Sequence, residues 1–205
     1  MKSVMISIQP KWVEKILNGD KTVEVRKTKP KLETPFKCYI YCTQGQKTDA
    51  LLVGEGQAKM MVCSDHTKAI PFGGSIGNGK VVGEFVCDGF DEFRDDGKGI
   101  GFRRFMALHD TCLSLAEMKA YLNGSWGYGW HISDLKVYDM PKALNSFHRW
   151  YEDDTRPCSV GAKCKHEYFD YNEGCHACEI DFDGEDCVYT RLTRPPQSWC
   201  YVEGE

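Results

Sequence analysis

The stretch SIQPKWVEKILNGDKTVEVRK, residues 7–27, decides the fold that we expect for this chain. It begins as a strand, enters a short helix at Pro10 with apolar residues at helical spacing, and leaves that helix at Gly19. Residues 21–27 then alternate valines with polar side chains, which is typical of a strand with one apolar and one polar face. The expected order is therefore strand, short helix, turn and two-faced strand.

The segment of the second strand carries the charged side chains of Lys21, Glu24 and Arg26. Alternation places Glu24 and Arg26 on the same side, whereas Lys21 has the opposite parity unless a turn after Gly19 brings it round. One interpretation is a solvent-exposed face, or a structural ion pair between Glu24 and Arg26. The functional interpretation is that the two cations neutralise a phosphate or a base carbonyl while Glu24 accepts from an exocyclic amine.

Alternation and turn residues predict the remaining elements. The expected strands are residues 4–9, 37–43, 51–56, 79–93, 127–139, ended by Pro141, and 198–202. A helix is expected over residues 114–124, with a capping box formed by Ser114 and Glu117, whereas residues 56–80 give no clear assignment. This order predicts an α+β fold: a small mixed β-barrel with two or more flanking helices.

Composition and charge restrict the classes of function. The 205 residues are 41% hydrophobic and 27% charged, as in globular proteins. The net charge of -4 disfavours a protein that coats nucleic acid through excess basic residues, but it allows a local basic pocket. No apolar run reaches the roughly 20 residues that cross a bilayer, and the N-terminus lacks a signal-peptide pattern, so we expect a cytoplasmic protein without a membrane partner.

The eleven cysteines are many for such a chain, and an odd number cannot all pair internally. Five of them fall in an acidic, turn-rich stretch, where a C-x-x-C knuckle and further thiolates predict a structural zinc site that supplies folding energy. Surface thiols or a redox pair in the knuckle are the alternatives. The candidate zinc ligands are Cys158, Cys164, Cys175, Cys178 and Cys187. The cysteines interpreted as small buried hydrophobes are Cys38, Cys42, Cys63, Cys87 and Cys112.

The change in composition also predicts the domain organisation. Residues 1–147 are expected to form the barrel, residues 148–190 an irregular cysteine-rich insertion, and residues 191–205 the closing strand of the barrel. No glycine-rich phosphate loop, H-E-x-x-H or G-x-S-x-G motif is present, which disfavours the commoner hydrolase and nucleoside-triphosphatase chemistries.

The segment 7–27 resembles the N-terminal signature of the ASCH family, part of the PUA-like superfold, in which a short helix ending in Asn-Gly leads into a strand bearing K-T-x-x-x-R. GKVVGEF, residues 79–85, and GYGWHISDLKVYDMPKAL, residues 127–144, are similar to the central and final barrel strands of that family. RLTRPPQSWCYVE, residues 191–203, is similar to the C-terminus of a bacterial and phage-associated subgroup.

The resemblance implies a cleft between barrel and helix that holds RNA or a modified nucleoside. ASCH amidohydrolases that act on acetylcytidine use a lysine and, three residues later, a threonine nucleophile, with a later glutamate assisting. Lys21 matches the lysine, Glu24 stands where the threonine falls, and Glu84 is the candidate assisting acid. A carboxylate can act as a base or a nucleophile, but it does not simply replace a threonine hydroxyl in amide cleavage.

The leading prediction is therefore a protein that binds RNA or a nucleoside. A hydrolase of acetylcytidine or of RNA phosphodiesters is the alternative, and a prophage-borne protein-interaction domain is a third. Aromatic side chains in strands are often core residues, but they also stack on unpaired bases. The predicted ligand-binding residues are Lys21, Glu24, Arg26, Tyr41, Trp130 and Trp199. The candidate catalytic residues are Lys21, Glu24 and Glu84.

Overall fold

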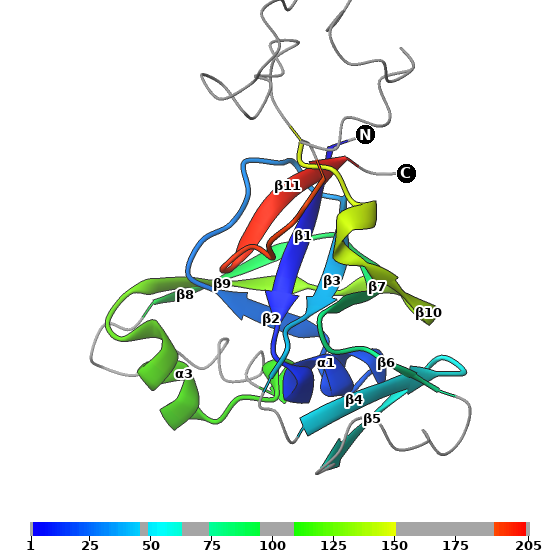
Figure 1. Cartoon of the computed structure of the whole chain (residues 1–205). Helices are drawn as coiled ribbons and strands as arrows, with labels where there is room; N and C mark the ends of the chain where they lie inside the picture. Colours follow the sequence, from blue (N-terminus) through cyan, green and yellow to red (C-terminus); the bar gives the residue numbers. More distant parts are fainter. Residues whose placement is uncertain (1, 46–48, 63–73, 95–108, 151–190, 204–205) are drawn as a thin grey trace, which may run out of the picture.

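The computed structural model describes residues 2–45, 49–62, 74–94, 109–150 and 191–203 (Figure 1). The helical elements are α1 (Pro10–Leu17), α3 (Leu115–Leu122) and the 3-10 turn η1 (Leu144–Ser146). The strands are β1 (Lys2–Ile8), β2 (Val23–Arg26), β3 (Phe36–Cys42), β4 (Asp49–Gly54), β5 (Gln57–Val62), β6 (Ser75–Ile76), β7 (Lys80–Cys87), β8 (Phe90–Arg94), β9 (Trp126–His131), β10 (Ser133–Ala143) and β11 (Trp199–Glu203). No helix within these ranges combines the length and the apolar character that crossing a bilayer requires.

The strands form a five-stranded sheet, in the order β10-β7-β3-β1-β11, and two three-stranded sheets, β2-β9-β8 and β5-β4-β6. β1 and β3 are parallel, whereas the other pairs are antiparallel. This mixed pairing, with helices beside the sheets, confirms the predicted α+β class. Among the described residues the ladders form three sheets, not one closed ring. The C-terminal strand β11 pairs with β1, so the two ends of the described chain lie side by side (Figure 1).

Two predicted strands each prove to be a pair of strands. Residues 127–139 divide at Ile132 into β9 and β10, and residues 79–93 divide into β7 and β8. Pro141 does not end a strand, as the sequence predicted, but lies inside β10. β10 tolerates the proline because it is an edge strand whose register with β7 shifts between Val137 and Lys142.

The central sheet buries a different apolar cluster on each face. Alternate residues of β1 and β3, such as Ile6 and Ile40, pack with Val13 and Ile16 of α1 in the first cluster. The intervening residues, such as Met5 and Tyr39, belong to the second cluster, together with Tyr138 and Phe147. We call these the α1 face and the opposite face of the central sheet.

Helix α3 covers one face of the sheet β2-β9-β8. The predicted capping box is present, because the Ser114 hydroxyl accepts from the Glu117 N–H and the Glu117 carboxylate accepts from the Ser114 N–H. Buried Leu122 packs with Val25 and with other residues of that sheet. A Cβ at Gly127 would lie 2.4 Å from Leu122 Cδ2, so the glycine permits the close approach of α3 to β9, the central strand of that sheet.

Candidate functional site

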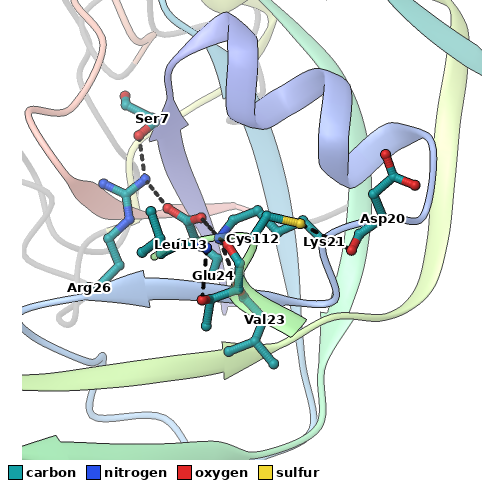
Figure 2. Close-up of polar contacts among 9 residues, drawn as sticks. Ser7, Asp20, Lys21, Val23, Glu24, Arg26, Cys112 and Leu113 are labelled. Carbon is teal, nitrogen blue, oxygen red and sulfur yellow. Dashed lines mark hydrogen bonds and ion pairs between the residues drawn. The ribbon is translucent and has the colours of Figure 1, made fainter. Parts of the chain in front are cut away.

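Lys21, Glu24 and Arg26 converge on one another at β2 (Figure 2). The Oε2 atom of Glu24 lies 3.2 Å from Lys21 Nζ, and its Oε1 atom lies 3.0 Å from Arg26 Nη2. The three residues are only 2%, 6% and 8% exposed, respectively. They form a buried ion cluster, which we call the charged triad, rather than a solvent-exposed strand face.

A turn after helix α1 explains how Lys21 joins the other two side chains. Gly19 adopts a φ of 79°, a conformation that glycine adopts without strain, and the Lys21 N–H donates to Lys15 O at 3.1 Å. Strand β2 begins only at Val23, so strand parity does not apply at residue 21. The turn after Gly19 that would bring Lys21 to the side of Glu24 and Arg26 is therefore present.

The Lys21 ammonium group is fully occupied by protein acceptors. Its Nζ donates to Val23 O at 2.8 Å and to Thr111 O at 2.6 Å, and it forms the ion pair with Glu24. An ammonium group has three N–H donors, and three acceptors surround this one. Lys21 therefore positions Glu24 and links β2 to residue 111.

Arg26 is less completely satisfied. Its Nη2 donates to Ser7 O at 2.5 Å and pairs with Glu24, whereas Nη1 has only a long contact of 3.5 Å with Ser198 Oγ. The buried Nε has no hydrogen-bond partner in the part of the chain that the structure describes. An unsatisfied buried donor is costly, so Arg26 retains hydrogen-bonding capacity for a further group.

The triad lines a cavity of about 700 Å³. Its walls come from the end of β1, from α1, β2 and α3, and from residues 195–197 before β11. The charged side chains in the lining are Lys21, Arg26, Glu24 and Glu117, two of each sign. Hydrogen bonds from Ser114 lower the pKa of Glu117, so this carboxylate is ionised at neutral pH. The lining is thus polar but balanced in charge.

Two aromatic residues that the sequence analysis did not select also line the cavity: Trp12 from α1 and Tyr121 from α3. Both helices lie below β2 in Figure 1. Lys21 Nζ lies 5.5 Å from the centre of the Trp12 ring, within the range of a cation–π contact. The helical spacing of apolar residues after Pro10 includes Trp12 in the apolar face of that helix, so periodicity does not single it out. Tyr121 lies off the apolar positions of residues 114–124 and is 40% exposed, and this exposure of a large aromatic side chain is the signal that could have identified it.

The structure places the three aromatic residues that the sequence selected, Tyr41, Trp130 and Trp199, outside the lining of this cavity. Trp130 is 0% exposed, and Tyr41, 4% exposed, belongs to the cluster on the opposite face. Trp199 donates from Nε1 to Thr28 Oγ1 at 3.0 Å, and its ring centre lies 6.1 Å from that of Trp130. None of the three lines the cavity.

Glu84, the candidate assisting acid, also lies away from the triad. It is the cross-strand partner of Tyr39 and therefore shares the opposite face of the central sheet. Tyr138 Oη donates to Glu84 Oε2 at 2.5 Å, and Lys37 Nζ lies 3.6 Å from Oε1. The structure thus separates Glu84 from Lys21, the first of the three candidate catalytic residues.

The zinc prediction concerns residues that the structure does not describe. Cys158, Cys164, Cys175, Cys178 and Cys187 all lie in 151–190, so the site remains a prediction; native mass spectrometry with and without a chelator tests it. In the ranges that are described, no three His, Cys, Asp or Glu side chains lie in a group that could hold a metal ion.

Several of the early cysteines are buried, as the sequence indicates. Burial raises the pKa of Cys42 and of Cys87 to about 12 and holds that of Cys38 well above its usual range, so these thiols stay protonated at neutral pH. The partly exposed Cys112 donates from Sγ to Asp20 O at 3.2 Å. Cys63 lies outside the described residues.

Comparison with known proteins yields a structural likeness but no sequence match. No family model and no curated protein matches the chain. Among solved structures, the chain is similar to ASCH from Zymomonas mobilis, with 17% identity over 69% of this chain and 73% of that chain, and a TM-score of 0.44. A mutant protein of the same ASCH gives 16% identity over 70% and 77%, also with a TM-score of 0.44.

Proposed function

We propose that this chain binds RNA or a free nucleoside, with one base inside the cavity beside the charged triad. The observation that carries the proposal is the triad itself, a buried ion cluster in the wall of a 700 Å³ cavity. Removing three charges from water is costly, and strongly interacting ionisable groups in a cleft are candidates for a functional site. The volume lies in the range of ordinary ligand pockets.

The lining favours a neutral, planar, polar ligand over an isolated phosphate. Its charges balance, so the interior offers no excess of positive charge to an anion. Trp12 and Tyr121 supply aromatic surface, and base–aromatic stacking contributes roughly 1–3 kcal/mol per base. Arg26 supplies the donor capacity that a base carbonyl or ring nitrogen accepts.

The contacts of Lys21 and Glu24 favour binding over turnover. Both carboxylate oxygens of Glu24 are held by cations, and all three Lys21 donors are directed at protein acceptors. A nucleophile or general base acts through a lone pair within reach of the substrate, and the charge on both Glu24 oxygens is already shared with cations. Lys21 has no donor left for a substrate, and Glu84 lies on the other face of the central sheet.

Isothermal titration calorimetry of the full chain tests the proposal. The probes are cytidine, uridine, adenosine, guanosine, acetylcytidine and a single-stranded RNA hexamer. We expect saturable binding that Trp12→Leu weakens by roughly fivefold or more, because the stacking surface is lost. Lys37→Met, which changes a lysine on the opposite face, is the matched control and should bind as the wild type does.

Chromatography of the same mixtures separates binding from hydrolysis. The proposal predicts unchanged acetylcytidine and intact RNA after prolonged incubation. Release of acetate or cleavage of RNA, abolished by Glu24→Gln, would establish the hydrolase instead. Absence of binding to every probe would reject the nucleoside site.

A further inference from the structure

We infer that the cavity reads one edge of a nucleobase through the main-chain N–H and C=O of Val25. This inference rests on the proposed function and adds to it the element that recognises the base. Val25 lines the cavity and is 5% exposed. The inference concerns its backbone, because β2 is the outermost strand of the sheet β2-β9-β8.

The hydrogen-bonding phase of β2 directs the backbone of Val25 away from β9. In the antiparallel register Val23 faces His131 and Val25 faces Gly129, and the Ile132 N–H donates to Thr22 O at 2.9 Å. Opposed residues alternate between hydrogen-bonded and non-hydrogen-bonded pairs. Even-numbered residues of this strand therefore bond to β9, whereas the N–H and C=O of residues 23, 25 and 27 point outward.

One outward neighbour of Val25 is hydrogen-bonded and the other is covered by a side chain. Val23 O accepts from Lys21 Nζ at 2.8 Å, and Lys27 lies against Tyr121, with its Nζ 5.6 Å from the centre of the tyrosine ring. For Val25, the described residues include no hydrogen-bond partner on this outer edge. Buried backbone groups are rarely left unpaired, so an unpaired N–H and C=O in a cavity wall indicate a place where a ligand binds.

A single base fits this donor and acceptor better than a peptide strand does. An added strand bonds to every second residue of an edge, and here Lys21 and Tyr121 occupy the positions on either side of Val25. A base needs only one such position. Cytosine offers ring N3 and its amino group, and uracil offers a carbonyl and ring N–H, each an acceptor beside a donor. The nearby Trp12 and Tyr121 suit a planar ring.

Methylated nucleosides test the inference from the ligand side by calorimetry. The pairs are uridine with 3-methyluridine, cytidine with N4,N4-dimethylcytidine, and adenosine with N6,N6-dimethyladenosine. In each pair the methyl groups remove the donor of the base edge. For each parent nucleoside that binds, the methylated partner should bind at least about tenfold more weakly, as expected for a lost hydrogen bond with a buried group left unpaired.

The matched ligand control is 5-methyluridine, which carries its methyl group on the other edge of the ring and should bind within about threefold of uridine. Equal binding of parent and donor-blocked nucleosides would overturn the Val25 inference while leaving the nucleoside site intact. Absence of binding by every parent nucleoside would instead reject the proposed function on which the inference rests.

A backbone substitution tests the same inference from the protein side. Cys38 allows a synthetic peptide of residues 1–37 to be ligated to the rest of the chain. An ester in place of the Val25 amide removes the N–H and keeps the side chain. The ester protein should melt only slightly below the ligated wild type, because the Glu24 C=O becomes a weaker acceptor toward β9 while the Val25 N–H has no protein partner to lose, and it should bind the parent nucleoside at least about fivefold more weakly. Unchanged affinity in a folded ester protein would overturn the inference.

Discussion

Two clusters of charged side chains in this protein invite comparison. In the charged triad, Lys21 and Glu24 have side chains that are 2% and 8% exposed and that border a cavity. In the other cluster, Glu84 pairs with Lys37 and Tyr138, and the side chains of Glu84 and Lys37 are 17% and 32% exposed. Both glutamates interrupt a largely apolar strand sequence, VEVR in β2 and KVVGEFVC in β7. Similar sequence patterns thus give a buried cluster beside a cavity in one place and a partly hydrated ion pair in the other.

The position of each strand in its sheet accounts for the difference. Glu84 lies on β7, which is flanked by β3 and β10. Glu24 lies on β2, which has a neighbour on one side only, so the turn after α1 and helix α3 can approach its free edge and enclose a cavity. An edge strand with its outward groups covered by side chains can therefore hold a ligand site that a central strand cannot.

The largest predicted difference between the two clusters is the loss of stability when the glutamate of each cluster is neutralised. Glu24→Gln leaves two buried cations without their counter-ion and should lower the free energy of unfolding by about 3–5 kcal/mol. Glu84→Gln, the matched change in the other cluster, should cost about 1 kcal/mol or less because water screens the partly exposed pair. Urea denaturation measures both. Equal losses would contradict the distinction between the clusters.

The next effect concerns the aromatic surface beside the triad. Trp12→Leu should weaken nucleoside binding by about 1–3 kcal/mol, the usual contribution of one stacked base. Trp126→Leu removes a tryptophan that is 47% exposed but does not line the cavity, and it should leave the affinity unchanged. Calorimetric titration compares the two proteins. A larger loss for Trp126→Leu would place the binding surface elsewhere.

A conservative exchange of cations should have a smaller effect. Arg26→Lys keeps the charge beside Glu24 but removes the planar group and its spare donors, so binding should weaken by about tenfold, while unfolding changes less than in Glu24→Gln. Lys37→Arg makes the opposite exchange, lysine to arginine, in the Glu84 cluster and should leave the binding affinity unchanged. If Arg26→Lys bound as tightly as the wild type, the unused guanidinium donors would have no role in recognition.

The smallest predicted effect is the pH dependence of the stability that Glu117, in the cavity lining, contributes. Hydrogen bonds from Ser114 lower the pKa of Glu117 in the folded protein. Its stabilising contribution is therefore fully present above the unfolded pKa, roughly 4.3, and is lost as the pH falls through the folded pKa. The difference in melting temperature between wild type and Glu117→Gln should shrink as the pH is lowered from 7 to below 4. A difference that grows on acidification would have the wrong sign for this account.

Local periodicity predicted much of the fold. The helix after Pro10 and the capping box at Ser114 depend on neighbouring residues, and both are present at the predicted places. The division of 127–139 at Ile132 and the tolerance of Pro141 depend on which strand lies at an edge of which sheet. That is information about distant pairing, which periodicity does not contain.

The candidate site was only partly predictable for the same reason. The charged residues of β2 stood out in the sequence, but Lys21 joins them through a turn and through the carbonyl of Thr111, 90 positions away. Alternation shows which residues share a strand face with Tyr41 or with Trp130. It does not show which face borders a cavity, so it could not exclude these two residues from the site. The unpaired backbone of Val25 depends on the hydrogen-bonding phase of β2 and β9, which no side-chain pattern reveals.

The central claim is that the cavity beside the charged triad, and not the Glu84 cluster, receives the base. Intermolecular nuclear Overhauser effects on the nucleoside complex test it directly, because they report which protons lie within a few ångströms of the ligand. Cross-peaks from the base protons to the Trp12 ring and the Val25 methyl groups are predicted. Cross-peaks to Tyr138 or Trp126 in their place would contradict the account.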